Sequence, residues 1–356
     1  MPGARHQESP LPPPAARRAA VEPWRASLSG ATLLGLLGCG PTARRYFVPA
    51  IARLTNARLT AAYDPLPEPR QSVARSAPGC RAFDSVEAML GARVVDAVLV
   101  GGAPERRASL TVSALGAGLP VLLEPPMASS LEEAEWIGEA ERAVRLPVMV
   151  GFHRWWWQPV ERLRLALAQS PEGELAVEST VDLDPDDSDP FVALAAHLDL
   201  VRRLSDREIA TVSGHRESLR EVQAHLTFHG GGQARCLVRS ADQPHERVTV
   251  RAGRRTYEMR SGSGRIRPAS GPGRRALDFM DSVLNRMLGR RGGVDRSYEG
   301  MLRAFVQQVE TRAFAGPGTS VGIAVLLATM AVRRSLEQGG TEMVVPAGLD
   351  PGPEAS

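Results

Sequence analysis

The regular alternation of short apolar runs with amphipathic stretches between residues 31 and 152 constrains this chain more than any other feature. The apolar runs cover residues 31–38, 57–63, 94–100, 121–123 and 148–152. The stretches between them have helical spacing over residues 42–54, 85–90, 104–118 and 130–145. Strands that alternate with helices at this spacing form βαβ units around a parallel sheet. We therefore predict an α/β domain over residues 31–152 whose strands are covered on both faces.

A glycine-rich turn joins the first predicted strand to the first predicted helix. It reads GCGPTA over residues 38–43, which is the pattern G-x-G-x-x-A. In a dinucleotide-binding loop, Gly38 would permit the tight turn, Gly40 would let the backbone approach a pyrophosphate, and Ala43 would let the helix pack closely on the sheet. The pyrophosphate would lie at the helix N-terminus, where free N–H groups and the helix dipole favour anions.

Asp64 stands at the end of the second predicted strand, 26 residues after Gly38. A carboxylate at that position can accept hydrogen bonds from the ribose hydroxyls of an adenosine and repel a 2′-phosphate. The loop and the acid together predict a Rossmann domain that binds NAD, and Arg70 nearby leaves NADP open. An ordinary structural turn is the alternative explanation of the glycines.

The pattern of hydrophobic residues changes after residue 158. Short alternating runs at residues 174–183, 210–213, 222–228, 234–239, 247–250 and 256–259 predict a mostly antiparallel sheet. Helices are predicted over residues 158–169, 193–204, 276–288, 298–312 and 320–337. We therefore predict a second α/β domain with an open sheet over residues 153–347. Residues 1–30, rich in proline and arginine, are predicted to be a disordered tail, and residues 348–356 a second tail.

Composition narrows the possible chemistry. All 43 residues in the Lys+Arg count are arginine, so neither a Schiff base nor a lysine acid is available. Cys39, Cys80 and Cys236 are far apart and odd in number, which argues against a disulfide framework or a zinc site and suits a reducing cytoplasm. Residues 1–30 have no apolar segment of a signal peptide, and the longest apolar stretch, 321–332, is shorter than the ~20 residues that span a bilayer. We expect a cytoplasmic chain without a metal, nucleic acid or membrane partner.

Several segments of the chain resemble the Gfo/Idh/MocA oxidoreductases, the group of glucose–fructose oxidoreductase and inositol dehydrogenase. These segments are LLGCG at 36–40, AYDP at 62–65, VDAVLV at 95–100, ALGAG at 114–118, VLLEPP at 121–126, SLEEA at 130–134 and VMVGFHR at 148–154. Residues 298–345 also look like that family's last helices and strand. The resemblance implies hydride transfer between a nicotinamide and the carbinol carbon of a small sugar or polyol. It further implies that Glu124 and Pro126 shape the nicotinamide edge, and that the chain forms a homo-oligomer through its open sheet.

The family's catalytic pattern carries over only in part. Relatives read Glu-Lys-Pro where this chain has Glu124 followed by two prolines, so Pro125 replaces the lysine that assists at the substrate hydroxyl. Relatives then place Asp and His four residues apart on a helix, with another Asp three residues on. This chain keeps His197 and Asp199 with altered spacing, and Arg107 stands where relatives often have histidine.

His197 is the remaining candidate for proton transfer, because an imidazole is close to half-protonated at neutral pH. A hydrogen-bonded helix histidine without a catalytic role is the alternative. Two functions follow. The chain is either a nicotinamide-dependent oxidoreductase with a non-standard, lysine-less active site, or a catalytically degenerate nucleotide-binding or partner protein of the same fold.

Residues 153–157, HRWWW, follow the last strand of the first domain. His153 lies where such sheets bind ligands, so it either faces the nicotinamide or makes a contact within the linker. The three tryptophans either wall a substrate pocket or pack at the junction between domains, and the second arrangement is the expected one.

Overall fold

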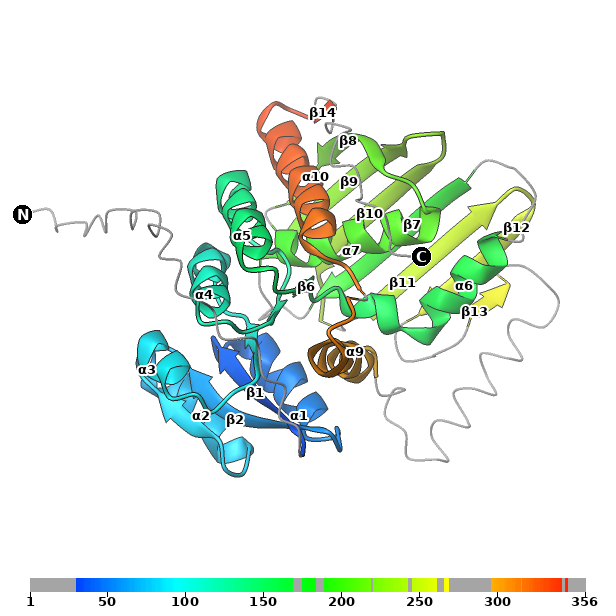
Figure 1. Ribbon diagram of the computed structural model, residues 1–356. Coiled ribbons are helices and arrows are strands. Elements are labelled where there is room, and N and C mark those ends of the chain that lie inside the picture. The colour runs from blue at the N-terminus through cyan, green and yellow to red at the C-terminus, as the bar shows by residue number, and fades with distance from the viewer. Residues whose placement is uncertain are drawn as a thin grey trace, which may run out of the picture.

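The computed structural model describes residues 30–168, 175–183, 189–218, 220–242, 245–260, 266–268, 296–314, 316–340 and 343–344. These residues form two sheets, one in each half of the molecule (Figure 1). The tail predicted at residues 1–30, Gly30 excepted, the tail at 348–356 and the helix predicted at 276–288 lie outside the described residues.

The first sheet has six parallel strands in the order β3-β2-β1-β4-β5-β6. The strands are β1 (Thr32–Leu37), β2 (Ala57–Tyr63), β3 (Arg81–Phe83), β4 (Ala97–Val100), β5 (Val121–Leu123) and β6 (Val148–Val150). All residues of β4, β5 and β6 are buried, which explains why these strands read as continuous apolar runs. The strand order reverses between β1 and β4, and sheets of this kind bind ligands at that switch point, beyond the carboxyl ends of the strands.

Helices cover both faces of the first sheet (Figure 1). They are η1 (Ala43–Phe47), α1 (Val48–Ile51), α2 (Pro67–Ser76), α3 (Val86–Gly91), α4 (Pro104–Gly116) and α5 (Leu131–Val144). η1 is a turn of π-helix, in which the N–H of Val48 bonds to the carbonyl of Ala43. Pro49 follows and has no N–H to give to Arg45, so the regular α-helical ladder is interrupted there.

The second sheet has eight strands in the order β13-β12-β11-β7-β10-β9-β8-β14. They are β7 (Leu175–Leu183), β8 (Ile209–His215), β9 (Glu221–Phe228), β10 (Gln233–Ser240), β11 (His245–Ala252), β12 (Arg255–Arg260), β13 (Ile266–Pro268) and β14 (Met343–Val344). Every neighbouring pair is antiparallel except β7 and β10, so the predicted mostly antiparallel sheet is confirmed.

The remaining helices come after β6 in the chain. They are the 3₁₀ helix η2 (His153–Trp156), α6 (Gln158–Ala168), α7 (Pro190–Ser205), α9 (Ser297–Thr311) and α10 (Thr319–Glu337). α7 and α10 cover one face of the second sheet, while α9 packs its buried residues onto the first sheet (Figure 1). The chain thus returns to the first sheet after building the second. The domain division at residue 152 stays a prediction.

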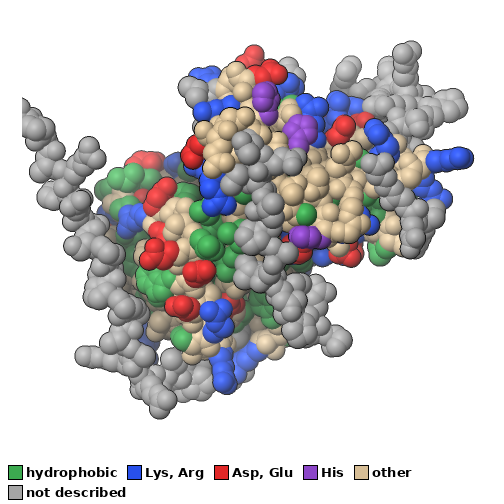
Figure 2. Space-filling view, turned by 90° about the horizontal axis from the view of Figure 1, so that it is seen from above, with side chains coloured by type: hydrophobic (Ala, Val, Ile, Leu, Met, Phe, Trp, Pro, Cys, Tyr) green, Lys and Arg blue, Asp and Glu red, His purple; other side chains and the backbone are tan. Residues whose placement is uncertain are grey.

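One described helix, α10, has the length and hydropathy to cross a membrane, and half of that window is buried in the protein. α10 contacts α5, α7 and β8, as a core helix does, and a core helix meets the same length and hydropathy criterion. On the face of the molecule that Figure 2 shows, arginine side chains are scattered among acidic ones rather than gathered in one patch.

Candidate active site

The two glycines of the loop differ in what surrounds them. Gly38 has φ +96°, and a Cβ placed on it would lie 2.6 Å from the carbonyl oxygen of Gly101. The fold therefore requires glycine at position 38. A Cβ on Gly40 would meet only the Cα of Gly102, at 3.8 Å, which is an ordinary van der Waals distance. Packing within the described chain does not require glycine at position 40, and the space above this residue suits a pyrophosphate.

Asp64 is bonded to the glycine loop from the end of β2. Its Oδ2 accepts a hydrogen bond from the N–H of Cys39 at 2.8 Å, and its Oδ1 accepts one from the N–H of Leu66 at 3.0 Å. Each oxygen keeps a lone pair for a ribose hydroxyl. Arg70 donates to the carbonyls of Asp64 and Pro65, so its guanidinium lies against the same turn. The residues at this switch point fit the adenosine and pyrophosphate of a dinucleotide.

A buried ion pair lies on the other side of the loop, beyond β4 and β5. The NH2 group of Arg107 is 3.2 Å from Oε2 of Glu124 and donates to the carbonyl of Gly102 at 2.7 Å. Its NH1 group donates to the carbonyl of Pro126 at 2.6 Å, after a cis peptide bond. Burial lowers the pKa of Arg107, and the charge of Glu124 opposes that effect. One side chain thus joins the turns that follow β4 and β5.

His197 lies inside a closed polar cluster against the second sheet and is 1% exposed. Its Nδ1 is 2.6 Å from the hydroxyl of Ser179 on β7, and its Nε2 is 3.7 Å from Oε1 of Glu246 on β11. Arg154 donates twice to the carboxylate of Glu246, at 2.7 and 2.8 Å. Burial and the charge of Arg154 lower the pKa of His197 to about 3. The expectation that His197 is half-protonated at neutral pH is therefore wrong, and the sequence does not reveal the burial that lowers its pKa. The role of His197 in proton transfer stays a prediction.

Asp199 is the group of α7 whose pKa lies near neutrality. It is fully buried, and its Oδ2 accepts a hydrogen bond from Nε1 of Trp155 at 2.9 Å. Its Oδ1 has no hydrogen-bond partner among the described residues. Burial raises its pKa to about 7, against the lowering effect of the Trp155 hydrogen bond. Arg203 stacks over the same indole at 3.9 Å, which places Trp155 at the junction between η2 and α7.

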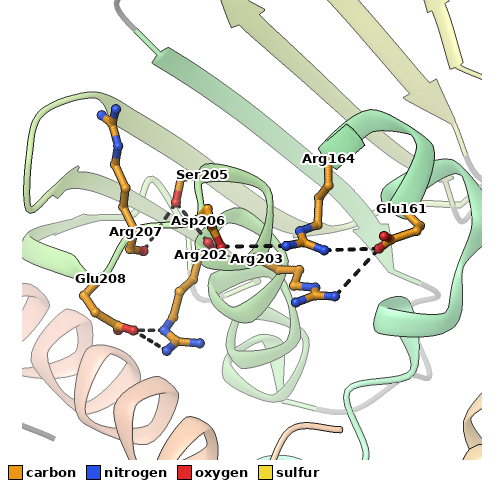
Figure 3. A network of polar contacts seen from close by, with 8 residues as sticks. All are labelled: Glu161, Arg164, Arg202, Arg203, Ser205, Asp206, Arg207 and Glu208. Carbon is orange, nitrogen blue, oxygen red and sulfur yellow. Dashed lines mark hydrogen bonds and ion pairs between the residues drawn. The ribbon is translucent and has the colours of Figure 1, made fainter. Parts of the chain in front are cut away.

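Ion pairs hold the C-terminal end of α7, the helix that carries His197 and Asp199 (Figure 3). Arg203 of α7 and Arg164 of α6 both pair with Glu161, at 3.7 and 3.2 Å. Arg202 forms a two-pronged pair with Glu208, just before β8. α7 is therefore held to α6 on one side and to the start of β8 on the other.

A stack of aromatic rings connects η1, the helix that follows the glycine loop, to the second half of the chain. Tyr298, at the start of α9, stacks with Tyr46 of η1 at a centroid distance of 4.6 Å. It also stacks with His153 of η2 at 4.1 Å. His153 therefore contacts α9 rather than a neighbour within the linker, and its place facing the nicotinamide stays a prediction. No pattern in the sequence indicates that Tyr298 is the ring that completes the stack.

Comparison with known proteins agrees with this geometry. Residues 33–152 match the GFO_IDH_MocA family, an oxidoreductase family with an NAD-binding Rossmann fold. Residues 33–152 therefore carry the NAD-binding Rossmann fold of that oxidoreductase family.

Curated relatives match part of this chain. The inositol 2-dehydrogenase of Corynebacterium glutamicum (strain R) is 30% identical over 149 residues, which are 42% of this chain and 44% of that protein. The inositol 2-dehydrogenase of Leifsonia xyli subsp. xyli is 32% identical over 139 residues, 38% of this chain and 41% of that protein. The chain thus matches less than half the length of either relative.

Solved structures share the whole fold. The myo-inositol dehydrogenase of Lactobacillus casei, in complex with NAD(H) and myo-inositol, superposes with a TM-score of 0.71 at 17% identity, over 89% of this chain and 98% of that one. The WlbA dehydrogenase of Bordetella pertussis, in complex with NADH and UDP-GlcNAcA, superposes with a TM-score of 0.73 at 17% identity, over 90% of this chain and 99% of that one. Both halves of the chain therefore have the fold of these dehydrogenases.

The structure groups the predicted site residues into two places. Gly38, Gly40, Ala43, Asp64, Glu124 and Pro126 lie along the carboxyl edge of the first sheet, and Ala43 is buried where η1 meets that sheet. His197 lies apart, on α7 against the second sheet. Sequence reasoning missed Ser179 and Glu246, because no motif links positions that meet only through strand pairing.

Proposed function

We propose that the chain is an NAD-dependent oxidoreductase of the Gfo/Idh/MocA type with a non-standard, lysine-less active site. The observation that carries the proposal is the space above Gly40. Packing of the described chain does not require glycine there, and a pyrophosphate would fill the space. The Rossmann match over residues 33–152 supports NAD as the cofactor. Bound NAD would supply the hydride acceptor or donor, and the protein would supply orientation and electrostatics.

The roles of the cofactor-binding residues follow from their places. Gly38 and Gly40 would carry the pyrophosphate loop, with Ala43 holding the helix N-terminus close to the sheet. Asp64 would accept hydrogen bonds from the adenosine ribose. Glu124 and Pro126 would shape the nicotinamide edge, beside the switch point between β1 and β4.

His197 would move the substrate proton. Pro125 has neither a charge nor an N–H, so it cannot replace the lysine of relatives. With its proton on Nε2, His197 faces the Glu246 carboxylate, and its Nδ1 accepts from the Ser179 hydroxyl. Substrate access to the ring would require the Arg154–Glu246 pair to move aside.

The substrate class is proposed from the relatives. The matched proteins are named inositol 2-dehydrogenases, so we propose a small sugar or cyclic polyol. We also propose a cytoplasmic location, and a homo-oligomer formed through the face of the second sheet that α7 and α10 leave uncovered.

A second candidate function is a nucleotide-binding protein without turnover. The burial of His197 inside the cluster with Ser179, Glu246 and Arg154 favours it, because the histidine is neutral and shielded from water. The same fold would then serve binding or a partner protein rather than catalysis.

Turnover of a panel of sugars, cyclic polyols and their ketones, with NAD+ or NADH, separates the two candidates. The oxidoreductase predicts activity on at least one compound, and a fall of about 10²–10⁴-fold in His197→Ala. His229→Ala, in an exposed turn after β9, is the matched control and should keep full activity. NADH binding without any turnover would favour the second candidate. Turnover that His197→Ala leaves unchanged would contradict the role of His197 alone.

A further inference from the structure

The Arg107–Glu124 pair lies next to the glycine loop, on the side away from Asp64. A Cβ on Gly38 would meet the oxygen of Gly101 at 2.6 Å, and a Cβ on Gly101 would meet Oε2 of Glu124 at 2.9 Å. The contacts therefore run in order along the edge from β1 to β4 and β5. With the adenosine ribose at Asp64, a dinucleotide across the switch point places its nicotinamide half toward Glu124.

The pair is enclosed and its positive charge is fixed. The side chains of Arg107 and Glu124 are 4% and 10% exposed. A guanidinium stays protonated under all ordinary conditions, so Arg107 compensates the carboxylate at any working pH. Removing one partner of such a pair leaves the other charge uncompensated, where little water screens it.

The two prolines after Glu124 make this cation important. Pro125 and Pro126 carry no charge, so the turn after β5 has no cation of its own. Arg107 comes from the first turns of α4 and brings a guanidinium to that same turn, through its bond to the Pro126 carbonyl.

We propose that Arg107 sets the net charge of the nicotinamide pocket. Through that charge it sets the ratio of the dissociation constants of the chain for NAD+ and NADH. The inference rests on the proposed NAD site. The nicotinamide ring is cationic in NAD+ and neutral in NADH, so a net charge in the pocket acts on one form and hardly on the other. Arg107 acts through Glu124 and through the two turns that it joins, and it is therefore a positioning residue.

The test compares the ratio of the dissociation constants for NAD+ and NADH in single and double variants at pH 8, by calorimetry and nicotinamide fluorescence. Glu124→Gln leaves an unpaired cation and should raise the ratio on the order of tenfold. Arg107→Gln leaves an unpaired carboxylate and should lower it by a similar factor. The double variant should have a ratio close to that of the wild type. If Arg107 had only a structural role, its loss would weaken the binding of NAD+ and NADH alike.

Two control variants isolate the charge at position 107. Arg107→Lys keeps the charge and should keep the ratio. Arg106→Gln removes the charge of the exposed neighbour, which donates to the Tyr63 hydroxyl, and should also keep it. If Arg107→Gln does not fold, the sign of the change in Glu124→Gln decides.

Single variants that shift the ratio in the same direction, or leave it unchanged while binding persists, overturn this inference alone. A wild-type chain that binds neither NAD+ nor NADH overturns the proposed function and this inference together.

Discussion

The carboxyl edge of the first sheet and the polar cluster around His197 differ in how much room they leave. At the first, a Cβ added to Gly40 would meet only the Cα of Gly102 at 3.8 Å, and the residue carries none. At the second, Ser179, Glu246 and Arg154 fill the surroundings of the histidine. Gly40 thus has room that packing of the described chain does not use, at the edge of the sheet where a ligand would bind, whereas polar and charged side chains surround His197. In our proposal the first site binds the cofactor and the second carries turnover, so each can be tested without the other.

The largest expected effect on stability concerns the other glycine of the loop. Gly38→Ala places a Cβ 2.6 Å from backbone oxygen at a positive φ, and should lower the free energy of unfolding by about 3 kcal/mol or more. Gly79→Ala is the matched control, since Gly79 has φ +82° but nothing within 4 Å of the added Cβ, and it should cost about 1 kcal/mol. Urea unfolding measures both. Equal losses would mean that the Gly38–Gly101 contact is not tight, and the distinction between the two loop glycines would fail.

A smaller effect should appear at the ribose position. Asp64→Ala should weaken NADH binding about tenfold and NADPH binding less, because a 2′-phosphate gains from loss of the carboxylate. Asp84→Ala, an exposed acid at the end of β3, should change neither affinity. Fluorescence titration with both nucleotides gives the values. A wild-type preference for NADPH would show that Arg70, which lies against the same turn, dominates the choice of cofactor.

The smallest effect is a pH dependence in the second region. The pKa of Asp199 is about 7 in the folded chain against an ordinary value of 3.8, so the folded chain keeps a proton that the unfolded chain has released between these values. This group therefore lowers stability as pH rises from about 4 to 7. Asp199→Asn cannot ionise and still accepts from Trp155, so its melting temperature relative to the wild type should rise by about 5 °C between pH 4 and pH 8.

The change in protonation of His197 is common to both proteins and cancels in that difference. Its lowered pKa removes stability as pH falls from 6.5 toward 3 in the wild type and the variant alike. A difference in melting temperature that stays constant with pH would contradict the buried, protonated state of Asp199.

The central strands of the first sheet could be predicted because they are largely buried on both faces. Residues 97–100 and 121–123, which form β4 and β5, read as unbroken apolar runs for that reason. α2 and β3 were not predicted, since α2 buries only Val73 and β3 is a three-residue edge strand with two exposed residues. Elements that bury little surface leave little hydrophobic pattern in the sequence.

The candidate site divides in the same way. Gly38, Gly40 and Asp64 belong to a local pattern fixed by one strand–turn–helix unit and the next strand, so their spacing in the sequence was informative. The neighbours of His197 come from β7, β11 and η2, and their meeting depends on strand pairing in the second sheet. The state of the imidazole depends on burial and on the charge of Arg154, and neither can be read from the residues next to it in the chain.

The NADH affinity of Gly40→Val tests the central claim, that the loop at residues 38–43 holds the pyrophosphate, most directly. Because an added Cβ meets only the Cα of Gly102 at 3.8 Å, the variant should fold with a melting temperature close to that of the wild type. Its side chain would occupy the space of the pyrophosphate, so we expect NADH affinity, measured by nicotinamide fluorescence, to fall by about 100-fold or more. Wild-type affinity in a folded Gly40→Val protein would contradict the claim.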